Sequence, residues 1–116
     1  MTSRAFTAYT KSRNLGLNGR ALEAEAFLQA ARSLDTPEAG SAIKGLRFTH
    51  SLWTILQADL LGKNNSLPEK LKSDLLSLSV FVDREITRAL TDPAPSRLKT
   101  LSDINRNLAA GLFAAN

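Results

Sequence analysis

Histidine, cysteine and paired carboxylates carry much of protein chemistry, and this chain offers few of them in a usable pattern. His50 is the only histidine among 116 residues, and there is no cysteine. A pair of histidine ligands for zinc or a thiolate nucleophile is therefore ruled out. Asp83 and Glu85 would face different sides of a helix, which argues against a catalytic carboxylate pair. We predict no catalytic residue, no cofactor site and no metal site, and we expect a protein that is not an enzyme.

The only histidine and the only tryptophan, His50 and Trp53, share an apolar stripe with helical spacing. For His50 the stripe favours a partly buried imidazole bonded to a neighbour over a proton-transfer group. Trp53 has two interpretations. It is either a core aromatic, which we favour, or a hot-spot residue in a groove that holds a partner helix.

Helical patterns fill the chain from about Asn18 onward, and they must position these side chains. The first is expected from Asn18 and Gly19 to about Asp35, because its residues are mostly strong helix formers. A second is expected to begin with Thr36 as N-cap and Pro37 in its first turn. Gly62 offers it a left-handed C-terminal cap.

Two further helices are predicted after this glycine. Ser66 and Glu69 have the spacing of a capping box around Pro68, which starts the third helix. Asp92 to Pro95 end it, and Ser96 can cap a fourth. We expect an all-α fold, a small antiparallel bundle of about four main helices in one domain over residues 1–116. The expected core residues are Leu46, Leu52, Leu56, Leu71, Leu75, Leu78, Val82, Ile86, Leu101, Ile104 and Leu108.

Positive charge is concentrated at the front of the chain. The net charge is +4, and four basic residues precede the first acid, Glu23, so the remainder is neutral. Residues 1–17 therefore form a basic N-terminal arm, which could contact RNA, contact an acidic partner or remain solvated. Phe6 and Tyr9 lie on this arm. Two interpretations stay open for them, a helical turn that docks on the bundle and an aromatic handle for a partner.

No targeting or membrane-spanning signal is visible in the sequence. The N-terminus lacks the apolar core of a secretory signal, and the most apolar stretches are short and interrupted or bordered by charged residues. The absence of cysteine is compatible with a reducing compartment. We expect a soluble, cytoplasmic protein without membrane contact.

The stretch from Arg47 to Glu85 resembles the central region of the FlaF family of alphaproteobacterial flagellar regulators. The shared features are an Arg-bearing helix, a Leu-Trp pair, an acidic residue, an Asn-x-Leu-Pro turn and a long apolar helix. They are carried by Arg47, Leu52, Trp53, Asp59, Asn65, Leu67, Pro68, Leu71, Leu78, Val82 and Glu85. The resemblance extends more loosely to Ala5, Tyr9, Leu101, Ile104, Leu108, Gly111 and Leu112, so it covers nearly the whole chain.

The resemblance implies a chaperone and regulator that binds flagellin in the cytoplasm. Such a protein would support flagellin synthesis and secretion by masking apolar flagellin helices, in a circuit with the FlbT regulator. An apolar, cofactor-free helical bundle is suited to that role, because it can hold an amphipathic helix in a groove. The candidate partner-binding residues are Phe6, Tyr9, Arg47, Trp53, Phe81 and Phe113.

Two alternatives remain open from the sequence. One is an RNA-binding post-transcriptional regulator that contacts flagellin mRNA through the basic arm. The other is a structural homo-oligomer that associates through the leucine seam of the third helix. The sequence leaves the oligomeric state open.

Overall fold

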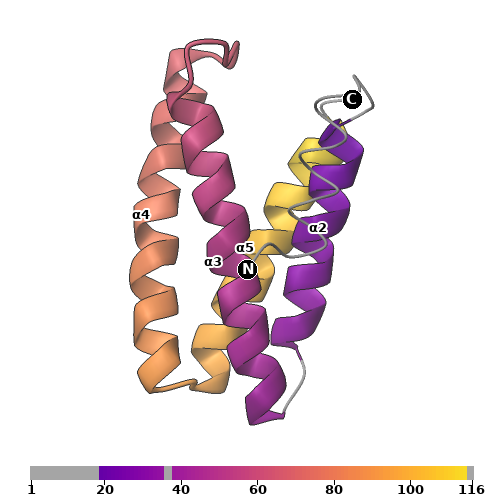
Figure 1. Ribbon diagram of the computed structural model, residues 1–116, viewed down its shortest axis with the longest axis vertical. Coiled ribbons are helices and arrows are strands. Elements are labelled where there is room, and N and C mark those ends of the chain that lie inside the picture. The colour runs from indigo at the N-terminus through magenta and orange to yellow at the C-terminus, as the bar shows by residue number, and fades with distance from the viewer. Residues whose placement is uncertain (1–18, 36–37, 115–116) are drawn as a thin grey trace.

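The computed structural model describes residues 19–35 and 38–114, which form four helices (Figure 1). They are α2 (Gly19–Leu34), α3 (Ala39–Leu61), α4 (Glu69–Thr91) and α5 (Pro95–Ala114). This part of the chain contains no strand. The all-α prediction is confirmed, and the predicted order and approximate bounds of the four helices are confirmed with it.

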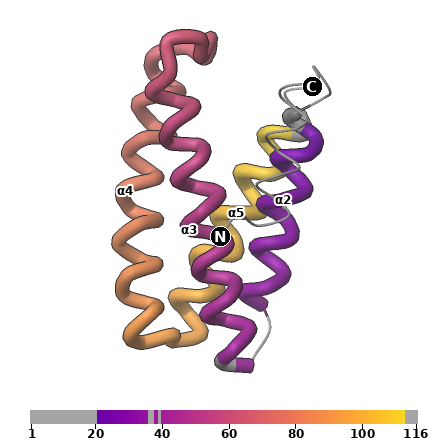
Figure 2. Tube along the Cα trace, viewed as in Figure 1, coloured from indigo at the N-terminus to yellow at the C-terminus, as the bar shows by residue number. Residues whose placement is uncertain are grey.

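The helices associate as two pairs that diverge from a common base. α3 and α4 run side by side as an antiparallel hairpin, and α2 lies along α5 (Figures 1 and 2). α4 packs mainly on α3 and makes few contacts with α5, although the chain between α4 and α5 is only a short turn. The pairs are close at the end where this turn lies and separate toward the opposite end.

The core lies where three helices meet around Trp53. The Trp53 side chain is fully buried, and the Phe27 ring of α2 meets it edge-on with centroids 5.8 Å apart. Each such buried large apolar side chain contributes about 1.5–3 kcal/mol before entropy is counted. Six predicted core residues are buried as expected, namely Leu46, Leu52, Leu56, Val82, Ile86 and Leu101.

A buried polar chain links α3 to α5 inside this core. The Trp53 indole Nε1–H donates to the Asn105 side-chain oxygen at 3.0 Å, and the Asn105 amide donates to Thr49 Oγ1 at 3.2 Å. All three residues are inaccessible to solvent. Every member therefore has a partner, as a buried polar group requires.

The crossing of α2 and α3 depends on a glycine. A Cβ atom at Gly45 would lie 3.1 Å from the Ser33 backbone carbon, from Ser33 Cβ and from Leu34 Cδ2. A Cβ atom there would require its neighbours on α2 to shift by a few tenths of an ångström. The absence of a side chain at Gly45 thus permits the close approach of α3 to α2 at this point.

The C-terminal end of α3 differs from the sequence prediction. Gly62 has φ −72° and ψ 147°, which is extended backbone and not the left-handed cap expected of it. Its amide instead donates to the Asp59 carbonyl at 3.1 Å and closes the last turn. Any residue could adopt this backbone conformation, so the glycine is not required by its φ angle.

Two predicted N-caps are also wrong. At α4 no side chain caps the helix, so the Ser66–Glu69 capping box does not form, and Pro68 occupies the cap position. α5 begins at Pro95, two residues earlier than a Ser96 cap implies, because the Ala94 carbonyl accepts the first helical bonds. Proline suits a first helical position, where its missing N–H needs no partner. Thr36 and Pro37, predicted to start α3, lie outside the described residues.

An ionic cluster ties the end of α2 to α5. The Ser102 hydroxyl bonds an Asp35 carboxylate oxygen at 2.8 Å, and the Arg106 guanidinium donates to both Asp35 and Ser102. The Arg106 hydrogen bond holds the pKa of Asp35 below its ordinary value of 3.8, and the Ser102 hydroxyl acts in the same direction. The ionised carboxylate is therefore favoured by folding.

We expect Asp35→Asn to destabilise the protein at neutral pH by about 0.5–1 kcal/mol, since the pair is nearly half exposed and screened by water. A lowered folded pKa means that the stabilisation is present above about pH 4 and disappears as the pH falls through the folded value. The difference in unfolding free energy between wild type and variant should shrink accordingly in urea titrations from pH 7 to about pH 3. A difference that does not change with pH would contradict this role of the Asp35 charge.

Candidate partner-binding groove

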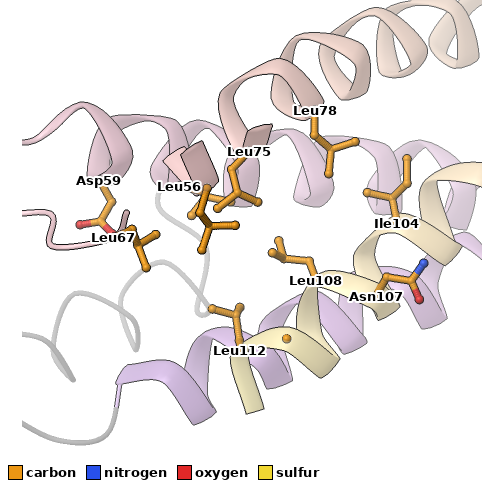
Figure 3. Close-up of a pocket in the computed structure, with 11 residues that line it drawn as sticks. Leu56, Asp59, Leu67, Leu75, Leu78, Ile104, Asn107, Leu108 and Leu112 are labelled. Atoms are coloured by element: carbon orange, nitrogen blue, oxygen red, sulfur yellow. The ribbon is translucent and has the colours of Figure 1, made fainter. Parts of the chain in front are cut away.

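An apolar groove opens between the two helix pairs, where they diverge. It encloses about 510 Å³, and eight of its eleven lining residues are leucine or isoleucine (Figure 3). We call it the leucine groove. Its lining residues are Leu56, Asp59, Leu67, Leu71, Leu75, Leu78, Ile104, Asn107, Leu108, Gly111 and Leu112.

Two helical seams face each other across the groove. Leu71, Leu75 and Leu78 recur at three-and-four spacing on α4, and Ile104, Leu108 and Leu112 recur every fourth residue on α5. Figure 3 shows Leu75 and Leu78 on one wall and Leu108 and Leu112 across from them. From the sequence alone, each seam is predicted to lie in the core. The space between them exists because α4 and α5 separate after their connecting turn.

This separation corrects the predicted core on α4 and α5. Leu71 is 43% exposed and is not a core residue. Leu75, Leu78, Ile104 and Leu108 are only partly buried and pack against the edge of the core. The physical reason is that their helices find no partner on this side within the described chain, so the outer half of each seam remains open to water.

The turn between α3 and α4 forms one end of the groove. Asn65 accepts a hydrogen bond from the Leu67 amide at 3.0 Å, and its amide group donates to the Asp59 carboxylate at 3.4 Å. The first bond is an Asx-type turn, which asparagine favours. It places Leu67 in the groove lining. This is the structural use of the Asn-x-Leu-Pro sequence, in which Pro68 then leads into α4.

The lining of the groove is almost entirely apolar. Asp59 and Asn107 are its only lining residues with polar side chains. In the part of the chain that the structure describes, no three His, Cys, Asp or Glu side chains are grouped closely enough to hold a metal ion. An occupant would gain mainly from burying its own apolar side chains against the leucines.

The predicted partner-binding residues are distributed differently from the groove. Trp53 is fully buried, so it takes the core role that the sequence favoured and is not reachable by a partner. Arg47 and Phe81 are exposed, but neither lines the groove. Phe6 and Tyr9, and the side chain of Phe113, lie outside the described residues.

His50 is also placed differently from its prediction. It is exposed on α3, whereas the sequence pattern favoured a partly buried imidazole. The stripe to which it was assigned turns away from the core at this position, because Thr49 and Trp53 take the buried positions around it. No described contact gives His50 a catalytic role.

Some residues that define the groove and core were missed from the sequence. Asn107 lines the groove although nothing in the sequence singled it out, and Leu67 and Gly111, which stood out only through the family resemblance, line it without belonging to a predicted seam. Asn105 was missed although it follows Leu101 by four residues on the inner face of α5. A polar residue in that register is a usable signal, because a buried amide implies a specific hydrogen-bond partner.

The wider chain matches a known family. A family model described as flagellar protein FlaF matches residues 5–112. The chain belongs to the FlaF family. No curated protein and no solved structure matched it. The matched region covers every residue that lines the leucine groove, so the groove is a feature of the FlaF domain in this protein.

Membership confirms the resemblance seen in the sequence and shows that this is a flagellar protein. Within residues 19–35 and 38–114, no helix has both the length and the hydropathy of a bilayer-spanning segment.

Proposed function

We propose that this FlaF protein binds flagellin in the cytoplasm and covers one of its apolar helices in the leucine groove. In doing so it acts as a chaperone and regulator that supports flagellin synthesis and secretion. The observation that carries the proposal is the groove itself, an open apolar surface between two helix seams in a protein of a flagellar family. The proposal needs no catalytic step, cofactor or metal.

The shape and chemistry of the groove suit an amphipathic helix. Helices bound in this way place apolar side chains at positions i, i+3 or i+4, and i+7 in a hydrophobic groove. Leu71, Leu75 and Leu78 have that spacing on one wall and would interdigitate with a matching ridge. Each apolar side chain of the occupant that becomes fully buried contributes about 1.5–3 kcal/mol before ordering is counted. A segment that is disordered before assembly loses part of that gain when it folds.

Covering such a segment would explain a role in secretion and in regulation. An unassembled flagellin subunit with exposed apolar helices would self-associate, and a chaperone would prevent this while keeping the subunit ready for export. The FlbT regulator would act in the same circuit.

The test is capture of flagellin in three forms. Purified full-length flagellin and two truncations, each lacking one terminal segment, would be applied to the immobilised protein. We expect one truncation to abolish capture and the other to leave it nearly unchanged. Equal capture of both truncations would refute the masking of a terminal helix.

RNA binding is a second candidate, favoured by the concentration of basic residues before Glu23. It predicts an affinity for flagellin mRNA that falls steeply as salt is raised. An affinity that does not depend on salt would eliminate it.

A further inference from the structure

The leucine groove ends close to the point at which the first 18 residues of the chain join α2. α2 begins at Gly19 beside the end of α5 (Figures 1 and 2). Leu112, in the last turn of α5, lines the groove. The chain ahead of Gly19 is therefore joined to the described fold near one end of the groove.

This N-terminal segment is long enough to occupy the groove. As a helix, residues 5–17 would be about 20 Å long at 1.5 Å per residue. The α4 wall from Leu71 to Leu78 extends over only about 10 Å by the same measure. The whole described fold is 37 Å in its longest dimension. Length therefore allows the segment to turn back from Gly19 and run along the groove.

The composition of the segment fits an apolar groove. Phe6 and Tyr9 are three residues apart, which places both rings on one face of a helix. Residues 5–17 contain two basic residues, Lys11 and Arg13, and no acid, so the other faces of this helix can remain in water. The family model begins at residue 5, so these positions belong to the FlaF unit and are not an appended tail.

We propose that residues 5–17 occupy the leucine groove in the free protein, with Phe6 and Tyr9 as anchors, and that flagellin displaces them. The competition rests on the proposed function, whereas the docking itself does not. If the segment covers the groove in roughly nine of ten molecules, the apparent affinity for flagellin is reduced about tenfold. The protein would then shield its own apolar groove until flagellin is present.

A spin label on the segment tests the docking directly. The chain has no cysteine, so Thr10→Cys in the full-length protein carries a single nitroxide and leaves both rings in place. In methyl NMR spectra we expect strong broadening of Leu71, Leu75, Leu78 and Leu108. Broadening of these signals no stronger than that of Ile43 and Leu90, which lie outside the groove, would overturn the proposal.

Two controls identify the occupant. Adding Phe6→Ser and Tyr9→Ser to the labelled chain should abolish the broadening, and persistence would show that the rings are not the anchors. A second control mixes spin-labelled protein that carries no NMR isotope with isotope-enriched protein that carries no spin label. The methyl signals of this mixture should show no broadening. Broadening in the mixture would mean that the segment of a second copy fills the groove, which would also overturn the proposal.

Measuring flagellin binding alongside the broadening distinguishes this inference from the proposed function. We expect the double variant Phe6→Ser/Tyr9→Ser, without label, to bind flagellin about five- to tenfold more tightly than wild type. Broadening of the methyl signals of the groove residues without any flagellin binding would support the docking and refute the proposed function. Flagellin binding that weakens in the double variant, without groove broadening, would instead show that the rings contact flagellin and would overturn the docking.

Discussion

Leu71→Gln is expected to weaken flagellin binding at least about tenfold while leaving the fold intact. Leu71 is 43% exposed and lines the groove, so its side chain is available to an occupant. In the complex the glutamine amide would be buried against apolar surface without a partner, which costs about 1–3 kcal/mol, and a tenfold loss corresponds to about 1.4 kcal/mol. Calorimetric titration with purified flagellin measures the change.

Leu90→Gln is the matched control for this variant. Leu90 lies on the same helix, is 44% exposed and does not line the groove. Glutamine is preferable to aspartate in both positions, because the two ends of α4 would respond oppositely to a negative charge. Both variants should retain the helical circular dichroism of wild type. Equal losses of flagellin affinity in the two variants would count against binding in the groove. Unfolding of the Leu71 variant would show that Leu71 is a core residue, as the sequence pattern suggested.

Asn105→Ala is expected to destabilise the bundle by about 3 kcal/mol. The substitution removes the partner of the Trp53 indole N–H and of Thr49, both buried, and leaves a small cavity beside them. An unsatisfied buried polar group costs about 1–3 kcal/mol, and the cavity adds to this. For a domain of this size the midpoint of thermal unfolding should fall by at least about 10 °C.

The single tryptophan makes this experiment direct, because Trp53 fluorescence reports the same core during urea or thermal unfolding. Asn107→Ala is the control, since Asn107 is exposed on the same helix. We expect it to change the unfolding free energy by no more than about 0.5 kcal/mol. Similar effects of the two alanine variants would show that the buried amide chain does not hold α3 and α5 together.

Helix existence was predictable because it depends on local patterns. Apolar spacing and strong helix formers located all four helices, and the proline-containing segments marked their boundaries. Helix ends were harder, as Gly62 and Ser66 show, because a capping residue competes with backbone bonds that only the folded turn determines. The Glu85–Arg88 ion pair, three residues apart on one helix, was predictable and forms at 2.9 Å.

The groove was predictable only in part. The apolar face of α4 is wider than one side of a small bundle needs, and a face of that width indicates either a central helix or a surface for a partner. Its location depends on how far α4 and α5 diverge, which follows from packing at Gly45 and at the Trp53 core and not from periodicity. For the same reason the sequence placed Leu71 in the core, whereas the structure leaves it 43% exposed. For Trp53, which the sequence offered as a core residue or a partner contact, the structure shows the favoured core position.

The most direct test of flagellin binding in the leucine groove is a methyl NMR titration of the full-length protein with purified flagellin. We expect the signals of Leu71, Leu75, Leu78 and Leu108 to shift or broaden with saturable dependence on flagellin. Those of Ile43, Leu61 and Leu90, which are exposed outside the groove, should stay in place. Saturable changes confined to these three residues, or no change at all, would contradict the account.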